Sequence, residues 1–295
     1  MPCGAAIIGA VPELPEVEYT RRLLRPAMEN ARFVTVLAVR PDLRYPLPPD
    51  FTARLEGNTV RSLGRRAKYL VAALSSGDIL LMHLGMSGSF RVVGGAGRKA
   101  RRDGGAAYYH ERSQLEKHDH VVFAMSSGYT VIFNDPRRFG FMKILAGTDD
   151  TAGWADGAIG PEPLDRRFTA ATLARALARR KVTLKTALLD QRVVAGLGNI
   201  YVSEALHRAR LSPLRIAATL ATTRATPTVR AVALTDAIKA TLKDAIAHRH
   251  RPAGPDRFRV YDREGKPCPR RGCGGTITRI VQGGRSTFFC RVCQR

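Results

Sequence analysis

The stretch on which the fold depends opens the folded part of a 295-residue chain and reads Pro12-Glu-Leu-Pro-Glu-Val-Glu18. Pro15 suits the first turn of a helix, where its missing N–H is not needed, and acidic residues there complement the positive end of the helix dipole. An acidic helix start gives no task to Pro12 or Glu13. A second interpretation is that Pro12 is the first residue of the working protein, where proline is a nucleophilic secondary amine. Inside a chain the same nitrogen is an inert tertiary amide.

The chain is strongly basic, with 48 Lys and Arg against 25 Asp and Glu and a formal charge of +23. Such an excess predicts a polyanionic partner, most often nucleic acid, with an anionic membrane surface as the other candidate. No apolar run approaches the roughly 20 residues that span a bilayer. Residues 1–11 carry no basic residue and make a poor signal peptide. We therefore expect a cytoplasmic protein that does not enter a membrane.

Periodicity and composition divide the chain into parts. A helix is expected over about 15–30, and short β-rich runs joined by turns follow it, which predicts a sandwich or barrel. A polar linker rich in Pro and Gly occupies 147–165, and four-residue apolar spacing beyond it predicts helices. The fold class is therefore α+β with several domains. The expected domains are an N-terminal β-sandwich or barrel with one helix over 12–146, a helical domain over 166–255 and a small metal-binding unit over 256–295.

Four of the five cysteines lie close to the end of the chain. Cys268-x4-Cys273 and Cys290-x2-Cys293 form two close pairs separated by a spacer of hairpin length. Such pairs can wrap one tetrahedral Zn²⁺, and four thiolates leave no open coordination position, so the ion would be structural. Free thiols or a disulfide pair are the alternatives, but the clustering favours a metal site in a reducing compartment.

Shorter motifs carry residues suited to nucleic acid. Ala195-Gly-Leu-Gly-Asn199 is a tight turn before a helix, whose N–H groups can bind phosphate, although such turns are common. Asp135-Pro-Arg-Arg-Phe-Gly140 suits phosphate contact and insertion into a base stack, or it is an ordinary strand-end turn. His83-Leu-Gly-Met-Ser-Gly88 places Met86 in a glycine loop or at the edge of a core. Arg285 lies at the expected hairpin turn, where spacing alone favours a surface arginine near phosphates.

Taken in order, the motifs resemble those of the bacterial formamidopyrimidine-DNA glycosylases. The resemblance runs from Pro12 to Arg295, and the Leu14 form of the opening is similar to this branch rather than to the related endonuclease VIII branch. It implies a β-sandwich, a helix–two-turn–helix domain and a zinc finger. The motifs are Pro12–Glu18, Arg66-Ala-Lys-Tyr-Leu70, His83–Gly88, Lys117-His-Asp-His120, Asp135–Gly140, Gly160-Pro-Glu-Pro-Leu164, Gly196-Leu-Gly-Asn-Ile-Tyr201 and the four cysteines with Gly284-Arg-Ser-Thr-Phe288.

The resemblance implies a monomeric, nucleoid-associated DNA glycosylase and AP lyase of base excision repair. It would excise 8-oxoguanine and formamidopyrimidines from double-stranded DNA, or act at abasic sites, and nick the strand by β,δ-elimination. Pro12 would attack C1′ and form a Schiff base, with Glu13 as general acid and base and with Lys68 and Arg285 as the cations of the elimination steps. The implied DNA contacts are His118, Arg137, Arg180 and Asn199, and the implied wedge that fills the stack after base flipping is Met86, Arg137 and Phe139.

Two features depart from the family pattern. Residues 1–11 precede Pro12 and would block its amine, so we expect a processed leader or a start-site error, with Val11 encoded by an initiating GTG. The segment of residues 247–259 is shorter than the Gly-rich loop with which members of the family close over the extruded base. Because this loop is short, we expect weaker selectivity for 8-oxoguanine. If Pro12 is not a free N-terminus, the alternative is a non-catalytic DNA-binding zinc-ribbon protein. An RNA- or ribosome-associated zinc-ribbon protein is a third possibility.

Overall fold

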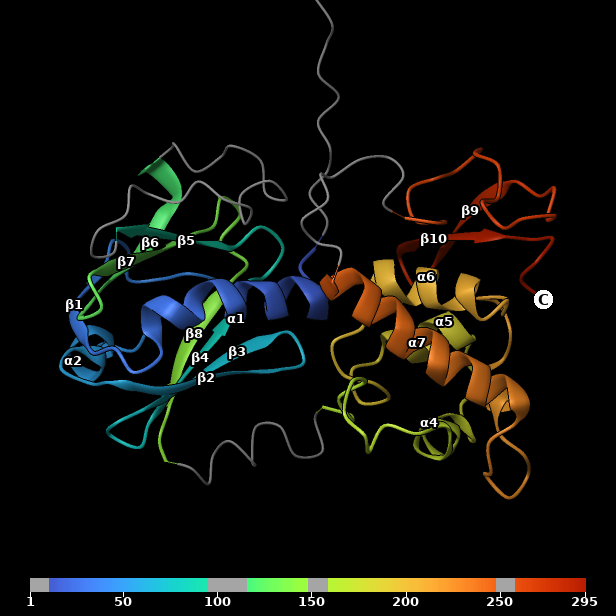
Figure 1. The fold of residues 1–295 in the computed structure, drawn as a ribbon, viewed down its shortest axis with the longest axis horizontal. Helices are drawn as coiled ribbons and strands as arrows, with labels where there is room; N and C mark the ends of the chain where they lie inside the picture. The colour runs from blue at the N-terminus through green and yellow to red at the C-terminus, as the bar shows by residue number, and fades with distance from the viewer. Residues whose placement is uncertain (1–10, 95–115, 148–158, 248–257) are drawn as a thin grey trace, which may run out of the picture. The chain divides into compact units, whose positions relative to one another are not determined.

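The computed structural model describes residues 11–94, 116–147, 159–247 and 258–295. The chain divides near residue 154 into two compact units (Figure 1). The first contains one long helix and two sheets. The second contains helices followed by a two-stranded hairpin.

Helix α1 (Leu14–Met28) opens the first unit. Glu13 is its N-cap and forms a capping box with Glu16, whose Oε2 accepts the Glu13 backbone N–H at 3.0 Å. Pro15 lies in the first turn, as the sequence predicted, and Pro26 lies in the last turn, close to where the helix ends. The helix is therefore stabilised at its start by acidic residues and buries its apolar face in the core of the unit.

The two sheets of the first unit have four strands each, in the orders β1-β6-β7-β5 and β2-β3-β4-β8, and all neighbouring strands are antiparallel. Helix α1 packs against β2 and β3 of one sheet and against β5 and β7 of the other. Both sheets contribute side chains to one buried core, which confirms the predicted sandwich. The elements are β1 (Phe33–Ala38), α2 (Phe51–Leu55), β2 (Val60–Arg66), β3 (Tyr69–Leu74), β4 (Ile79–His83), β5 (Ser89–Gly94), η2 (Glu116–His118), β6 (Asp119–Met125), β7 (Tyr129–Asn134) and β8 (Phe141–Leu145).

The second unit begins with helices, as the apolar spacing predicted. Thr169 caps the first of them, and its side chain accepts the Thr172 N–H at 3.2 Å. Helix α6 packs against α5, α7 and β10 and is therefore central to the unit. None of the described helices is long and apolar enough to cross a membrane. The elements are α4 (Ala170–Leu177), α5 (Leu184–Leu189), α6 (Asn199–Arg208), η3 (Ala217–Leu220), α7 (Val229–Ala247), β9 (Ile277–Gln282) and β10 (Arg285–Cys290).

A buried carboxylate joins α6 to the segment that leads into the hairpin. Glu204 is 8% exposed, and its two oxygens accept the backbone N–H groups of Arg259, Val260 and Tyr261, each at 2.9 Å. Burial raises the pKa of Glu204, and the three donated hydrogen bonds oppose that rise. The chain is thus fixed to α6 before it reaches the first cysteine.

Gly85 allows the two loops at one end of the sandwich to touch. Its φ is +63°, and a Cβ there would lie 2.2 Å from the backbone carbon of Phe139. Gly77 has a φ of +92° but an open surrounding, so it is a matched control. We expect Gly77→Ala to lower the free energy of unfolding by about 1 kcal/mol through its backbone conformation alone. Gly85→Ala should lower it by at least about 2 kcal/mol more than the control, because the loops must separate.

Urea unfolding of the two variants beside the parent chain measures the difference. Equal losses at both positions would show that the loops do not touch in solution.

Candidate nucleic-acid interface and metal centre

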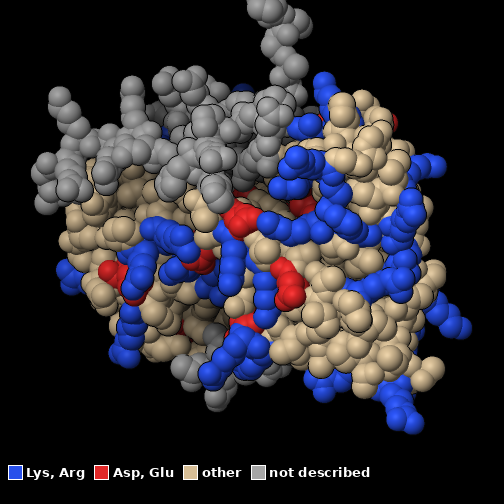
Figure 2. Space-filling model, turned by 45° about the vertical axis from the view of Figure 1, so that its right-hand side comes forward, with Lys and Arg blue, Asp and Glu red and all other residues tan. Residues whose placement is uncertain are grey.

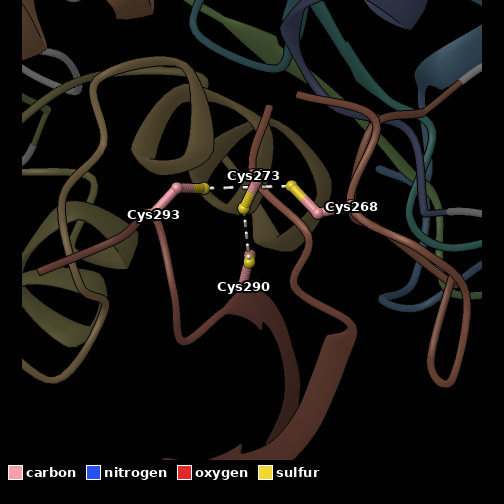
Figure 3. A group of neighbouring side chains, drawn as sticks. All are labelled: Cys268, Cys273, Cys290 and Cys293. Atoms are coloured by element: carbon pink, nitrogen blue, oxygen red, sulfur yellow. Dashed lines mark hydrogen bonds between the residues drawn. The ribbon is translucent and has the colours of Figure 1, made fainter. Parts of the chain in front are cut away.

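The four cysteines predicted to bind zinc converge in the second unit (Figure 3). Their sulfur atoms all lie within 4.8 Å of one another, with Cys268 and Cys293 3.8 Å apart and Cys273 and Cys290 3.5 Å apart. These separations are too long for a disulfide bond of about 2.05 Å. Four Zn–S bonds of about 2.3 Å in tetrahedral geometry place the sulfurs about 3.8 Å apart. The donor set therefore fits one structural Zn²⁺.

A buried carboxylate connects two loops of the first unit. Asp135 is 0% exposed, and one of its oxygens accepts the Ser87 hydroxyl at 2.5 Å while the other accepts the Gly140 N–H at 2.7 Å. The Asp135 carbonyl oxygen lies 2.9 Å from His120 Nε2, which donates to it. The loop around Ser87 and the loop of residues 135–140 are consequently held as one rigid piece, which we call the loop platform.

The loop platform carries all three residues predicted to form the wedge. Met86 is half-buried, whereas Arg137 and Phe139 are exposed. The Arg137 guanidinium lies 4.8 Å from the centre of the Phe139 ring, a cation–π contact that orients both side chains. The Arg137 N–H also donates to Ser87 Oγ at 3.2 Å. An exposed ring and a guanidinium on a rigid base are suited to enter a base stack.

Pro12 and Glu13 directly precede α1, and both are buried, with Glu13 2% exposed. Lys68 lies in the turn between β2 and β3, next to Ala67, whose φ is +53°. His118 ends the short helix η2, and its carbonyl oxygen accepts the Asp135 N–H at 3.0 Å. His118 is therefore attached to the loop platform through the main chain.

His83 links the Lys68 turn to the loop platform. Burial, together with the positive charges of Lys68 and Arg44, lowers the pKa of His83 to about 4. The ring is therefore neutral at pH 7, and its Nδ1 accepts the Gly85 N–H at 3.0 Å. It also stacks on Phe141 with ring centres 5.2 Å apart. His83 therefore supports the loop platform through its hydrogen bond with Gly85.

Arg285 is the first residue of β10, directly after the turn of the hairpin. Gly283 and Gly284 both have positive φ, +56° and +71°, which a tight two-residue turn requires. Arg285 pairs with Gln282 across the turn and is exposed. The structure therefore confirms the predicted position at the hairpin turn and presents the side chain to solvent.

The residue after Arg285 is held by two helices. The Ser286 carbonyl oxygen accepts the Lys185 ammonium of α5 at 2.8 Å and the Asn199 side-chain amide of α6 at 2.9 Å. Lys185 is 0% exposed and donates also to Thr287 Oγ1 at 2.6 Å. The hairpin that carries Arg285 is thereby fixed to the helical part of its own unit.

Two further DNA-contact candidates lie in the helical part. Asn199 begins α6 after a glycine turn that Gln191 organises by accepting the Gly196 N–H at 2.9 Å and donating to the Leu197 carbonyl at 2.7 Å. Arg180 donates to Asp190 Oδ2 at 2.9 Å, so part of its guanidinium is already engaged. Their contact with DNA stays a prediction.

Hydrogen bonds from Arg192, and to a smaller extent from Arg180, lower the pKa of Asp190 to about 2. The carboxylate is therefore ionised throughout the physiological range.

Figure 2 shows Lys and Arg side chains gathered on the face that it draws, with few Asp and Glu, in keeping with the formal charge of +23.

Sequence models of three domains match the chain in order. They are the formamidopyrimidine-DNA glycosylase N-terminal domain over residues 11–142, its H2TH domain over 159–252, and the zinc finger found in FPG and IleRS over 265–295. Together they cover most of the chain. It belongs to the formamidopyrimidine-DNA glycosylase family.

Relatives named formamidopyrimidine-DNA glycosylase match along their whole length. The protein of Rhodopseudomonas palustris is 58% identical over 297 residues, covering 96% of this chain and 100% of the relative, and that of a Bradyrhizobium species is 55% identical with 97% and 100% coverage. Among solved structures, the MutM (Fpg) protein of Thermus thermophilus is 36% identical with a TM-score of 0.76, covering 96% of this chain and 98% of that one. The Lactococcus lactis enzyme, non-covalently bound to DNA containing an AP site, is 30% identical with a TM-score of 0.79, covering 96% and 99%.

Sequence reasoning gave no role to Lys185 or Ser87. Ser87 lies inside the His83–Gly88 motif, but nothing in the spacing of that motif reveals its hydrogen bond to Asp135, which is 48 residues away. Lys185 does leave a signal, because it stands three residues before Leu188 and so on the same face of its helix. A charged residue on an apolar face indicates a buried polar contact.

Removing the ammonium of Lys185 should loosen the hairpin. Lys185→Met keeps the length of the side chain but loses its charged hydrogen bonds, which contribute about 1.5–3 kcal/mol when buried. We expect the β10 amides to exchange hydrogen faster, with a loss in the free energy of protection of the same size. Lys181→Met is the matched control, because Lys181 is exposed nearby. Mass spectrometry of the exchanged hairpin measures both, and unchanged β10 protection in Lys185→Met would contradict the assignment.

Proposed function

We propose that the protein is a bifunctional DNA glycosylase and AP lyase of base excision repair that removes oxidised purines from duplex DNA. The observation that carries the proposal is the ordered match of all three family domains, supported by full-length relatives that share the name. The basic surface, the loop platform and the zinc site supply what binding to damaged duplex DNA requires. We expect it in the cytoplasm at the nucleoid, where duplex DNA is found.

Pro12 is the proposed nucleophile. An α-amino group has an unperturbed pKa of about 8, so a useful fraction is neutral at cellular pH. Its nitrogen attacks C1′ as the bond from C1′ to the damaged base breaks, and the base leaves with a proton. The attached amine then loses its own proton, and breaking of the C1′–O4′ bond, with a proton transferred to O4′, gives the cationic iminium. The iminium withdraws electrons and acidifies the C2′ proton. Loss of that proton expels the 3′-phosphate, and a second elimination expels the 5′-phosphate.

Glu13, Lys68 and Arg285 are assigned the supporting steps. Glu13 adjoins the nucleophile in sequence, where a carboxyl group can move the protons that ring opening requires. Lys68 and Arg285 carry positive charges suited to phosphate leaving groups. The bonds from Lys185 and Asn199 to Ser286 would hold the strand behind Arg285 in place. Bound zinc holds the ends of the same hairpin together and takes no part in the chemistry.

The wedge residues are proposed to fill the space that the flipped nucleotide leaves. Unstacking a base costs a few kcal/mol, and a rigid insert lowers that cost more than a mobile one, because its own ordering is already complete. Asp135 and Ser87 supply this rigidity through buried hydrogen bonds. His118, Arg137, Arg180 and the start of α6 at Asn199 are assigned to phosphate contacts.

A free Pro12 amine is the condition for activity. The N-terminal domain match begins at residue 11, and residues 1–10 lie outside the described part of the chain. We expect borohydride to trap a covalent adduct on abasic DNA with a chain that begins at Pro12, and at least about 100-fold less adduct with residues 1–11 retained, since an amide nitrogen is not a nucleophile.

Pro12→Gly replaces the secondary amine of Pro12 with a primary N-terminal amine and is the control for a general amine effect. Absence of any adduct from the chain that begins at Pro12 would favour the non-catalytic DNA-binding alternative.

Lesion preference depends on the segment between α7 and Val260, of which residues 248–257 lie outside the described part of the chain. The prediction that a short loop weakens selectivity therefore stands as made from the sequence. We expect excision of 8-oxoguanine to fall relative to that of formamidopyrimidine by about 10-fold compared with a long-loop relative, since fewer contacts read the flipped base. Single-turnover cleavage of matched duplexes measures the ratio, and equal discrimination by the two enzymes would refute the prediction.

A further inference from the structure

His207 occupies the last turn of α6 and has no task in the proposed chemistry. It is 0% exposed, and its Nε2 lies 3.4 Å from the sulfur of Cys268. A buried histidine at the edge of a cluster of metal-binding sulfurs is either a ring that fills space or a hydrogen-bond donor to a ligand. The two possibilities differ in where the ring proton lies.

The metal-bound form of Cys268 decides that position. A zinc-binding cysteine is a thiolate, which has no proton to give, so a ring nitrogen at hydrogen-bond distance must carry the proton itself. With the proton on Nε2, a neutral ring has a bare Nδ1. His207 Nδ1 is buried and finds no hydrogen-bond partner in the part of the chain that the structure describes. Both nitrogens therefore fit a single proton on Nε2 that points at the sulfur.

We propose that His207 is an outer donor of the zinc site, whose Nε2–H hydrogen-bonds the Cys268 thiolate and connects the metal to α6. Four thiolates around Zn²⁺ leave an excess of negative charge in a partly buried place, and an N–H donor reduces it. Groups of this kind also orient the ligand, and their removal commonly weakens metal affinity by about 10- to 100-fold. His207 is thus a positioning residue and does not bind the ion.

A second connection runs between the same two elements. Arg270, between the first two cysteines in sequence, donates through Nη2 to the carbonyl oxygens of His207 at 2.5 Å and Arg208 at 3.5 Å. The His207 carbonyl oxygen also accepts the Arg210 N–H at 3.1 Å where α6 ends. The main chain of His207 is therefore attached to the cysteine loop that its side chain supports.

The test uses the full chain with zinc bound and two variants. His207→Phe keeps a ring of similar size and removes the donor, whereas His207→Gln keeps an N–H group at the position of Nε2. We expect zinc to pass to an excess of chelator about 10- to 100-fold faster from His207→Phe than from the parent chain, and at a rate close to the parental one from His207→Gln. Phe and Gln variants that both release zinc at the parental rate would overturn the proposal.

Two spectroscopic measurements separate a donor from a space-filling ring. In the Co²⁺-substituted protein the sulfur-to-metal charge-transfer band should shift in His207→Phe and stay in place in His207→Gln. In the unsubstituted parent chain, long-range ¹H–¹⁵N spectra of the histidine rings should show the Nε2–H form for His207. This second measurement needs no variant, so it holds even if His207→Phe fails to fold. An Nδ1–H ring would refute the proposal directly.

Discussion

The buried carboxylate of Asp135 is the constraint on which the first unit depends. A buried carboxyl group must have its oxygens satisfied, and here the donors come from two different loops, through Ser87 and Gly140. The requirement to satisfy this one side chain therefore fixes the relative position of both loops. The position of the loops in turn sets the position of their exposed side chains, including the Phe139 ring. The geometry of this surface follows from an interaction that lies beneath it.

The second unit uses the same principle with different chemistry. Lys185 and Glu204 are buried groups on helices, and each binds the main chain of a segment distant in sequence. Main-chain partners have fixed positions, so such bonds define where a strand runs more strictly than side-chain pairs do. The hairpin has only a small core of its own, formed by Val260, Ile277, Phe288 and Cys290, and a bound metal and the helices would add to its stability.

The sequence predicted what depends on local pattern. Short β-rich runs joined by turns predicted a sandwich or barrel, and the cysteine spacing predicted the cluster that Cys268 and its partners form. The turn before Arg285 followed from two adjacent glycines. Contacts such as Lys185 with Ser286, separated by 101 residues, have no local pattern and needed the fold. The assigned roles of Pro12 and Glu13 came from resemblance, since spacing alone also allowed an acidic helix start.

The anchoring of residues 259–261 by Glu204 has a consequence for how this family diversifies. The connection after α7 begins where that helix ends and finishes at the N–H groups that Glu204 binds. Both of its ends are therefore fixed by groups outside it. Closing a loop between fixed ends costs only about 0.6 kcal/mol more for each doubling of its length. Insertions and deletions there can therefore accumulate across lineages almost without a stability penalty. The length of the chain there can change while the hydrogen bonds of Glu204 stay unchanged.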